Sequence, residues 1–441
     1  MSEGDDVTRL SKTEEPNSRP MPTGKTLRKH FALSGRIRGA LTSLALSIGF
    51  FVAIGGGPAR SQSRKPLEEI GTVRQIYDGA LYPDIQVQTF RNIDRLFPTR
   101  TIKRGTQVFP LPKSDVPLKV LQFASAGKKY DIYDYMSLNR VSGLLVIKDG
   151  KIAFERYELG NKETTRWMSM SMVKSISSTL VGVAIQDGYI KSLGDPITKY
   201  LPSLAGSAYE GVTVRNLLQM ASGVKWDETY TNPASDRRHM LDAQLSGKPG
   251  SILEFMRTLP RAGKPGTIWN YNTGETQVVG ELIHAAVKRP VAQYLSERIW
   301  SKFGMESDAT WWLESPNGQE IGGSGLSATL RDYGRFGLFF LNGGIVGGKS
   351  ILPEGWMGEA GSPKMIGGKK VNYGYMWWIP DSSANPVHEG AFLAEGIFGQ
   401  YLYLNPAEKV VVVVWSARPK PTGRDPIKDE DFFAAVVKAL H

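Results

Sequence analysis

A serine and a lysine three residues apart, Ser171 and Lys174, have a spacing that could support covalent catalysis. On a helix, residues i and i+3 share one face, with Cβ atoms about 5–6 Å apart. A serine hydroxyl is a weak nucleophile at neutral pH and needs a base beside it. A lysine amine can be that base once burial or neighbouring positive charge has lowered its pKa enough to leave it neutral. The Met- and Trp-rich segment around the pair, TTRWMSMSMVKS, favours such burial.

The spacing alone is a weak signal, because Ser-x-x-Lys occurs three times, beginning at Ser125, Ser171 and Ser222. Ser125 lies in a Gly- and Lys-containing stretch with no apolar helix after it, and Ser222 follows the end of a helical pattern. Only Ser171 precedes a run whose apolar residues recur at helical spacing, from Ile176 to Ala184. We therefore expect Ser171 in the first turn of an anchored helix, where backbone N–H groups without helical partners point toward a developing oxyanion.

Two further segments could supply the other groups that acyl transfer needs. Tyr271 lies in a turn-rich loop, PGTIWNYNTGE, just before a helical pattern, and a phenol beside a lysine can pass a proton to a leaving amine or alcohol. Gly396 and Ile397 lie at the entrance to a strand, where an edge N–H could be a second oxyanion donor opposite Ser171. Taken singly, Tyr271 is better explained as a packed tyrosine, and a plain Gly-rich turn is the alternative for Gly396 and Ile397.

Six segments in this order resemble the serine hydrolases related to class C β-lactamases and penicillin-binding proteins: SMSMVKS, LLQMASGVKWDETY, PGTIWNYNTGETQVVGELI, GGSGLSATLRDYGRFG, YGYMWWI and GIFGQYLYLNPAEKVVVVVWS. The resemblance covers roughly residues 135–440. Within that group it is strongest toward the 6-aminohexanoate-dimer hydrolases, which are amidases and esterases acting on short linear nylon oligomers. Several motifs in the same order are far more specific than a single Ser-x-x-Lys.

The resemblance implies a role for each candidate residue. Ser171 would be the nucleophile, Lys174 its general base, and Tyr271 the proton relay to the leaving group. The N–H groups of Ser171 and Ile397 would form the oxyanion hole. A tyrosine in WDETY, Tyr230, matches a tyrosine that contacts the amide substrate in the nylon-oligomer enzymes, although a core aromatic explains it equally well.

Two departures from the group's motifs bear on the substrate. The Tyr-x-Asn motif is Tyr-Asn-Thr at residues 271–273, so its third-position amide is missing. The Lys-Thr-Gly motif is Ala-Glu-Gly at residues 394–396, which keeps Gly396 as a substrate-binding candidate but lacks the cation that would pair with a β-lactam carboxylate. Both departures put β-lactamase and transpeptidase activity in doubt and leave acyl transfer to water intact. An ester, an amide and a D-amino-acid peptide all stay open as substrates.

Three other functions are less consistent with the sequence. Residues 343–350, GGIVGGKS, match the Walker phosphate loop, but they follow a helical pattern and precede Pro353, whereas a phosphate loop joins a buried strand to a helix. A Ser-His-Asp hydrolase would use His239, His284 or His388, and the chain has no Gly-x-Ser-x-Gly elbow. A binding protein whose site had decayed would have lost catalytic side chains that are all present here. Five dispersed histidines and no cysteine predict neither metal nor cofactor.

The hydrophobic pattern predicts an α+β protein. Hairpins are expected at residues 141–158, around an Asp-Gly turn, and at residues 400–416, around an Asn-Pro turn. Valines at 410–414 predict a central strand that is buried on both faces. Helical patterns occur at residues 171–187, 214–220, 275–288, 330–342 and 429–440. An antiparallel sheet built from the N- and C-terminal parts, flanked by helices and carrying a mostly helical insertion, is therefore expected, as the β-lactamase/transpeptidase resemblance also implies.

The first 61 residues are expected to lie outside that domain. Residues 1–30 are polar and charged, which predicts disorder. Basic residues then precede an apolar run at 40–54 and a stretch of small residues, a pattern typical of a secretory signal. The run is shorter than the about 20 residues of a membrane span, so a cleaved signal and an uncleaved anchor both stay open. Either predicts export to a bacterial periplasm or its membrane, with an irregular lead-in at 62–135 and the hydrolase domain at 136–441.

Composition narrows the partners. The net charge is +11, from 54 basic and 43 acidic residues, but the basic residues are scattered, with no dense run interleaved with aromatic residues, so no nucleic-acid groove is expected. The lack of cysteine excludes disulfides and thiolate nucleophiles. The expected partner is a small ester or amide, with membrane association only through the N-terminal segment and no prediction of oligomeric state. Four tryptophans could line an apolar cleft or the core: Trp311, Trp312, Trp377 and Trp378.

Overall fold

The computed structural model describes residues 67–423 and 425–441. The chain divides into two units, residues 1–65 and 66–441. The apolar run at 40–54 lies outside the described residues, so the signal peptide or anchor stays a prediction. None of the helices in the described ranges is both long enough and apolar enough to cross a bilayer.

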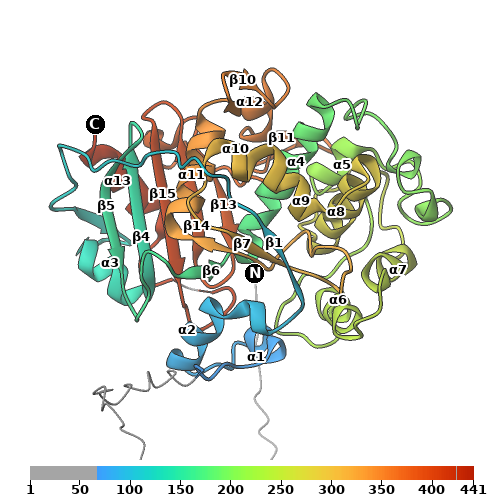
Figure 1. The fold of residues 1–441 in the computed structure, drawn as a ribbon, viewed down its shortest axis with the longest axis horizontal. Coiled ribbons are helices and arrows are strands. Elements are labelled where there is room, and N and C mark those ends of the chain that lie inside the picture. The colour runs from blue at the N-terminus through green and yellow to red at the C-terminus, as the bar shows by residue number, and fades with distance from the viewer. Residues whose placement is uncertain (1–66, 424) are drawn as a thin grey trace, which may run out of the picture. The chain divides into compact units, whose positions relative to one another are not determined.

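A five-stranded antiparallel sheet joins the two ends of the predicted hydrolase domain (Figure 1). Its strand order is β13-β14-β15-β4-β5, so the C-terminal hairpin pairs with the N-terminal hairpin, as predicted. Every residue of β15 is buried, because the strand lies between β14 and β4, and this explains its five valines. The strands are β4 (Val141–Lys148), β5 (Lys151–Tyr157), β13 (Phe392–Gly396), β14 (Gln400–Asn405) and β15 (Val410–Ser416).

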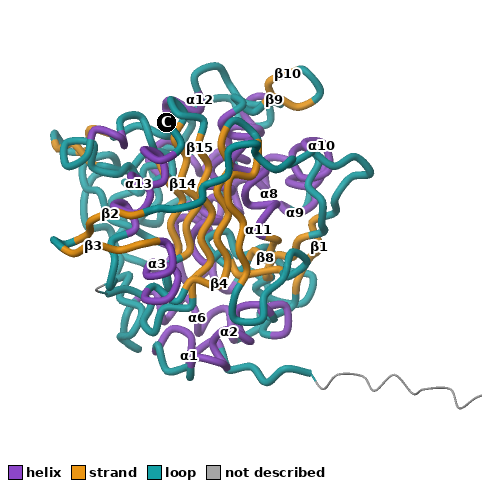
Figure 2. Tube along the Cα trace, turned by 90° about the vertical axis from the view of Figure 1, so that its left-hand side faces the viewer, coloured by secondary structure: helices purple, strands orange, loops and turns teal. Residues whose placement is uncertain are grey.

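Helices cover both faces of this sheet (Figure 2). On one face, α11 (Leu330–Leu341) packs against β4, β14 and β15, and Gly337 permits the close approach because an added Cβ would lie 2.8 Å from Val411. On the other face lie α3 (Ile132–Leu138) and α13 (Asp429–Ala439). Tyr135 of α3 stacks on Phe432 of α13, with ring centroids 3.7 Å apart. The sheet is therefore buried on both sides and forms a rigid base for the ends of its strands.

A mostly helical part lies between β5 and β13 in the sequence, as predicted. Its longest helices, α4 and α8, pack against each other. The predicted helices all form, with boundaries shifted by a few residues. The helices of this part are α4 (Val173–Gln186), α5 (Val214–Leu218), α6 (Asp236–Leu245), α7 (Ser251–Thr258), α8 (Thr273–Val287), α9 (Val291–Leu295), α10 (Ser301–Phe303) and α12 (Trp356–Ala360), in addition to α11.

Shorter strands form a second antiparallel sheet and three small hairpins. The sheet has the order β1-β7-β8-β6, with β1 (Thr99–Ile102), β6 (Arg166–Met168), β7 (Ala309–Trp312) and β8 (Leu326–Thr329). The hairpins pair β2 (Gln122–Ser125) with β3 (Lys128–Asp131), β9 (Ile345–Val346) with β10 (Lys349–Ser350), and β11 (Lys364–Ile366) with β12 (Lys369–Val371). The Walker-like residues 343–350 are the β9–β10 hairpin and its approach, not a strand-to-helix loop, so the phosphate-loop interpretation is wrong.

The segment at 62–135 was expected to be irregular, and over its described residues that expectation is wrong. It contains α1 (Val73–Asp78) and α2 (Pro83–Arg91) besides β1, β2, β3 and the start of α3. Helix α1 begins with a capping box between Thr72 and Gln75. Both helices are too short to show a clear helical period, which is why the sequence pattern did not reveal them.

Candidate active site

Ser171 lies in a 3-10 turn, η2 (Met170–Met172), that leads into α4, rather than in the first turn of the α-helix as predicted. Met170, directly before it, has a φ of 46°, in the left-handed region. Such a backbone at a non-glycine residue costs about 1–3 kcal/mol and is concentrated at functional sites. The strained turn holds Ser171 at the junction of β6 and α4, facing the end of β13, whose residues contact η2.

Lys174 is positioned by the first turn of α4, directly behind the serine. Its Nζ lies 2.8 Å from Ser171 Oγ and donates a hydrogen bond to the carbonyl oxygen of Gly323 at 2.9 Å. The side chain is only 1% exposed, and this burial lowers its pKa to about 7. Glu228 acts to raise that pKa, and Arg237 acts to lower it. A large fraction of the amine is therefore uncharged at neutral pH and can accept the serine proton.

Tyr271 approaches the same serine from the loop before α8. The helix is capped by the next residue, Asn272, whose side-chain oxygen accepts a hydrogen bond from the N–H of Glu275 at 3.0 Å. The Tyr271 ring centroid lies 5.3 Å from Lys174 Nζ, and its hydroxyl interacts with the Ser171 side chain. Burial, followed by the charge of Glu228, raises the pKa of Tyr271 above its ordinary value. The phenol is therefore protonated at neutral pH and is placed to donate a proton.

Gly396 and Ile397 bring the end of β13 against the nucleophile. A Cβ added to Gly396 would lie 3.0 Å from the backbone nitrogen of Ser171 and 2.7 Å from the carbonyl oxygen of Ser169, so only glycine fits at this position. Ile397 follows and lines two cavities together with Ser171. In the described part of the chain, no loop, cap or side-chain hydrogen bond uses the N–H of Ile397. The two N–H groups predicted as oxyanion donors thus lie beside one another.

A cavity of about 440 Å³ opens in front of Ser171. Its other lining residues are Glu228, Thr229, Tyr230, Thr231, Tyr271, Trp378, Glu395, Ile397 and Thr422. A much smaller cavity, about 10 Å³, lies between Ser171, Tyr77, Tyr230 and Arg237, among others. All the predicted site residues line one of these cavities except Lys174, which lies behind Ser171, and Gly396, which lies against it.

Glu228 is a site residue that the sequence pattern did not single out. Its carboxylate accepts hydrogen bonds from the Trp226 indole at 2.5 Å, the Thr273 N–H at 2.9 Å and the Thr273 hydroxyl at 2.5 Å. Thr273 occupies the position where the group's motif has an amide, and here it anchors Glu228 instead. The sequence did hold a signal for Glu228, because it is an acidic residue two positions before Tyr230 in the WDETY segment.

Tyr77 and Arg237 were also missed, and the sequence held no signal for them. Tyr77 comes from α1 and Arg237 from α6, and the Arg237 guanidinium donates a hydrogen bond to the Tyr77 hydroxyl. The Tyr77 ring stacks on Tyr230 with centroids 6.3 Å apart. An ion pair between Arg238 and Asp78, 2.6 Å long, joins the same two helices. The lead-in therefore supplies one wall of the site.

The histidines do not join this cluster. His388 contacts the Tyr403 hydroxyl at 3.0 Å and the carbonyl oxygen of Glu430 at 3.2 Å, and His284 of α8 contacts the carbonyl oxygen of Arg289, just after that helix, at 3.1 Å. His239 packs against Phe255. None of the three lines a described cavity that contains Ser171, so the Ser-His-Asp alternative is wrong. Of the four tryptophans that could line a cleft or the core, three are core residues, Trp311, Trp312 and Trp377. The fourth, Trp378, lines the 440 Å³ cavity.

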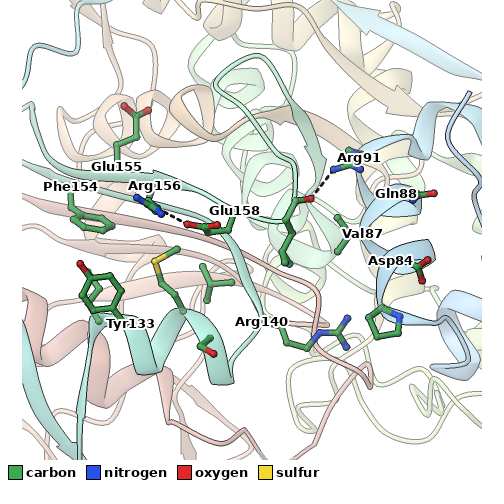
Figure 3. Close-up of a pocket in the computed structure, with 16 residues that line it drawn as sticks. Asp84, Val87, Gln88, Arg91, Tyr133, Arg140, Phe154, Glu155, Arg156 and Glu158 are labelled. Carbon is green, nitrogen blue, oxygen red and sulfur yellow. Dashed lines mark hydrogen bonds and ion pairs between the residues drawn. The ribbon is translucent and has the colours of Figure 1, made fainter. Parts of the chain in front are cut away.

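A larger cavity, about 850 Å³, lies away from this site, between α2, α3 and β5 (Figure 3). An Arg156–Glu158 ion pair of 2.6 Å lies on its wall, and Arg91 donates a hydrogen bond to the carbonyl oxygen of Leu159. None of the predicted site residues lines it. The catalytic candidates therefore belong to the cavity of about 440 Å³ in front of Ser171.

The fold and site together define a serine hydrolase of the β-lactamase and transpeptidase type. The Beta-lactamase family model matches residues 138–435, and the chain belongs to this family. The chain is 28% identical to the 6-aminohexanoate-dimer hydrolase of Paenarthrobacter ureafaciens over 357 residues, which cover 76% of this chain and 86% of that protein. It is 25% identical to a β-lactamase of Pseudomonas fluorescens over 180 residues, covering 39% of this chain and 46% of the relative.

Solved structures share the fold. A proposed 6-aminohexanoate-dimer hydrolase from Bacillus anthracis superposes with a TM-score of 0.69 at 23% identity, covering 80% of this chain and 92% of that one. A family VIII carboxylesterase gives a TM-score of 0.54 at 15% identity, covering 70% of this chain and 94% of that one. A class C β-lactamase gives 0.51 at 16% identity, covering 70% and 93%. The predicted α+β architecture is confirmed.

Proposed function

We propose that this protein cleaves an amide or ester bond through an acyl-enzyme on Ser171, as an amidase or carboxylesterase. The observation that carries the proposal is the arrangement around one hydroxyl. Lys174 Nζ lies 2.8 Å from Ser171 Oγ with its pKa lowered to about 7, and the protonated phenol of Tyr271 adjoins the same oxygen. A base that is neutral and an acid that is protonated at the same pH are what acyl transfer requires.

The proposed acylation step balances its protons. Neutral Lys174 takes the Ser171 proton as Oγ bonds to the substrate carbonyl carbon, and the N–H groups of Ser171 and Ile397 stabilise the oxyanion. As the carbonyl re-forms, the bond to the leaving group breaks. Tyr271 gives its proton to the departing amine or alcohol and receives the proton held by Lys174. Water then attacks the acyl carbon with the same groups in reverse roles, releasing the acid and restoring Ser171.

A linear substrate is favoured over a β-lactam. Residues 394–396 present Ala-Glu-Gly where a cation would pair with a β-lactam carboxylate, and the acidic residue Glu395 lines the cavity instead. The relative from Paenarthrobacter ureafaciens is named for a linear amide dimer, which supports a linear amide here. Turnover of p-nitrophenyl esters, N-alkyl amides of 6-aminohexanoic acid, a chromogenic cephalosporin and a D-alanyl-D-alanine peptide tests this. We expect the highest kcat/KM for the linear esters and amides, and a preference for either of the other two would overturn the proposal.

The acid limb of the pH profile is expected near pH 7. The pKa of Lys174 is lowered to about 7, and only the uncharged amine accepts the serine proton. With a neutral ester, kcat/KM should therefore be constant above that pH and fall about tenfold per pH unit below it. Because Glu228 raises the pKa of Lys174, Glu228→Gln should move the limb to lower pH. A limb near pH 4, unaffected by this substitution, would contradict a lysine base.

Tyr271→Phe is expected to impair amide cleavage far more than cleavage of a p-nitrophenyl ester. The substitution keeps the ring that stacks on Trp378 at 5.3 Å and removes only the hydroxyl. An alkylamine must be protonated to leave, whereas p-nitrophenolate leaves without a proton. We expect kcat/KM for amides to fall about 100-fold and for the activated ester by much less. Equal losses for the two leaving groups would show that the phenol is not the proton donor.

A further inference from the structure

Glu395 presents a carboxylate to the cavity in front of Ser171, and this carboxylate makes no hydrogen bond or ion pair with the described residues. It lies on β13, one residue before Gly396, and lines the 440 Å³ cavity with Tyr271 and Trp378. Among the described residues, the influences on its pKa are burial and through-space charges, and no hydrogen bond to its carboxylate is found. Withdrawing a carboxylate from water without a partner is costly, and a cation bound in the cavity would supply the partner that Glu395 lacks.

The neighbouring charges leave this carboxylate unneutralised. Arg418 is the nearby cation, and it already pairs with Asp425 at 2.7 Å and with Asp429 at 2.6 Å. Glu430 adds a further negative charge on the same side. Burial, followed by the charge of Asp429, raises the pKa of Glu395 to about 7, and Arg418 acts to lower it. The field at this end of the cavity is therefore negative and favours a cation.

The rest of the cavity wall suits an organic cation rather than a metal ion. Glu228, the other acid on the wall, already accepts three hydrogen bonds from Trp226 and Thr273, so Glu395 is the acid of this wall without a hydrogen-bond partner among the described residues. The rings of Tyr271 and Trp378 stack 5.3 Å apart beside Glu395, and aromatic faces attract ammonium groups. A cavity of about 440 Å³ has room for an alkyl chain that ends in such a group.

We propose that Glu395 is an ammonium-binding subsite, which selects esters or amides whose leaving group carries a positively charged amine. The inference rests on the proposed function of Ser171. The leaving-group side follows from the cavity wall that Glu395 shares with Tyr271, the proposed proton donor to that group, whereas Lys174 lines neither cavity that contains Ser171. The subsite also fits the loss of the lysine from the Lys-Thr-Gly motif. That lysine would attract a substrate carboxylate, whereas Glu395 would repel one.

Two pairs of isosteric substrates test the proposal. The first pair is 5-aminopentyl butyrate and hexyl butyrate, which differ at the end of the leaving group. The second is p-nitrophenyl 6-aminohexanoate and p-nitrophenyl heptanoate, which differ at the end of the acyl chain. We expect at least a tenfold preference for the charged member of the first pair, of the size that one charged hydrogen bond supplies. Glu395→Gln should abolish that preference.

A matched variant and two readouts separate the outcomes. Glu389→Gln removes an exposed carboxylate from the loop before β13 and should keep the preference. A loss in Glu395→Gln that is equal for charged and uncharged esters, or a preference confined to the acyl pair, would overturn the subsite as placed. If Ser171→Ala still hydrolysed hexyl butyrate, the proposed function would fail instead, whatever the substrate preference.

Discussion

Replacing Ser171 with alanine is expected to lower kcat/KM for p-nitrophenyl butyrate by about 10⁴-fold or more. The hydroxyl supplies the bond that forms to the acyl carbon, and the protein has no other group within the cluster that can replace it. The side chain lies in a 3-10 turn at the cavity floor and fills little space, so the variant should fold normally. Steady-state hydrolysis, with thermal unfolding measured in parallel, checks both statements.

Ser125→Ala is the matched control for this result. Ser125 also begins a Ser-x-x-Lys sequence, but its hydroxyl accepts a hydrogen bond from the Lys428 N–H at 3.1 Å, next to α13 and away from the cavity. We expect this variant to keep the wild-type kcat/KM. Substantial activity in Ser171→Ala, or an equal loss in Ser125→Ala, would contradict the assignment of the nucleophile.

The second large effect is expected for Lys174→Met. Methionine fills a similar volume and removes the amine that lies 2.8 Å from Ser171 Oγ. General-base catalysis contributes about 10²–10⁴-fold, so kcat should fall by about 10³-fold with little change in KM. In a Glu395→Gln background, which removes the other cavity group with a pKa of about 7, the acid limb near pH 7 should disappear together with the lysine. A pH–rate profile of the residual activity measures both effects.

The pH readout separates a catalytic role for Lys174 from a structural one. If the lysine only holds the carbonyl of Gly323, its loss should lower the unfolding temperature and leave the shape of the pH profile unchanged. A variant that unfolds near the wild-type temperature and still shows a limb near pH 7 would require a different base.

Local patterns predicted the parts of the fold that depend on near neighbours. The valines of β15 predicted a strand buried on both faces, and β14 and β4 do flank it. The apolar stripe after Ser171 predicted the helix that places Lys174 on the serine's side. These predictions hold because alternation and helical periodicity follow directly from the side chains that a strand or helix buries.

The sequence could not predict contacts made by segments far apart along the chain. The left-handed φ of Met170, which places Ser171 in a 3-10 turn, is imposed by the junction between β6 and α4 rather than by the residue type. Tyr77 lies outside residues 138–435, the part that matches the family, yet it contacts Arg237 at the wall of the site. Short, weakly periodic helices such as α1 give no pattern from which such a contact could be inferred.

Intact-protein mass spectrometry after incubation with a slowly hydrolysed p-nitrophenyl ester tests the central claim most directly. The account predicts that the wild-type protein gains the mass of one acyl group, that peptide mapping places it on Ser171, and that Ser171→Ala gains nothing. Lys174→Met should acquire the same mass at a much lower rate. Acylation of Ser171→Ala to the wild-type extent, or an acyl group found on another residue, would contradict the account.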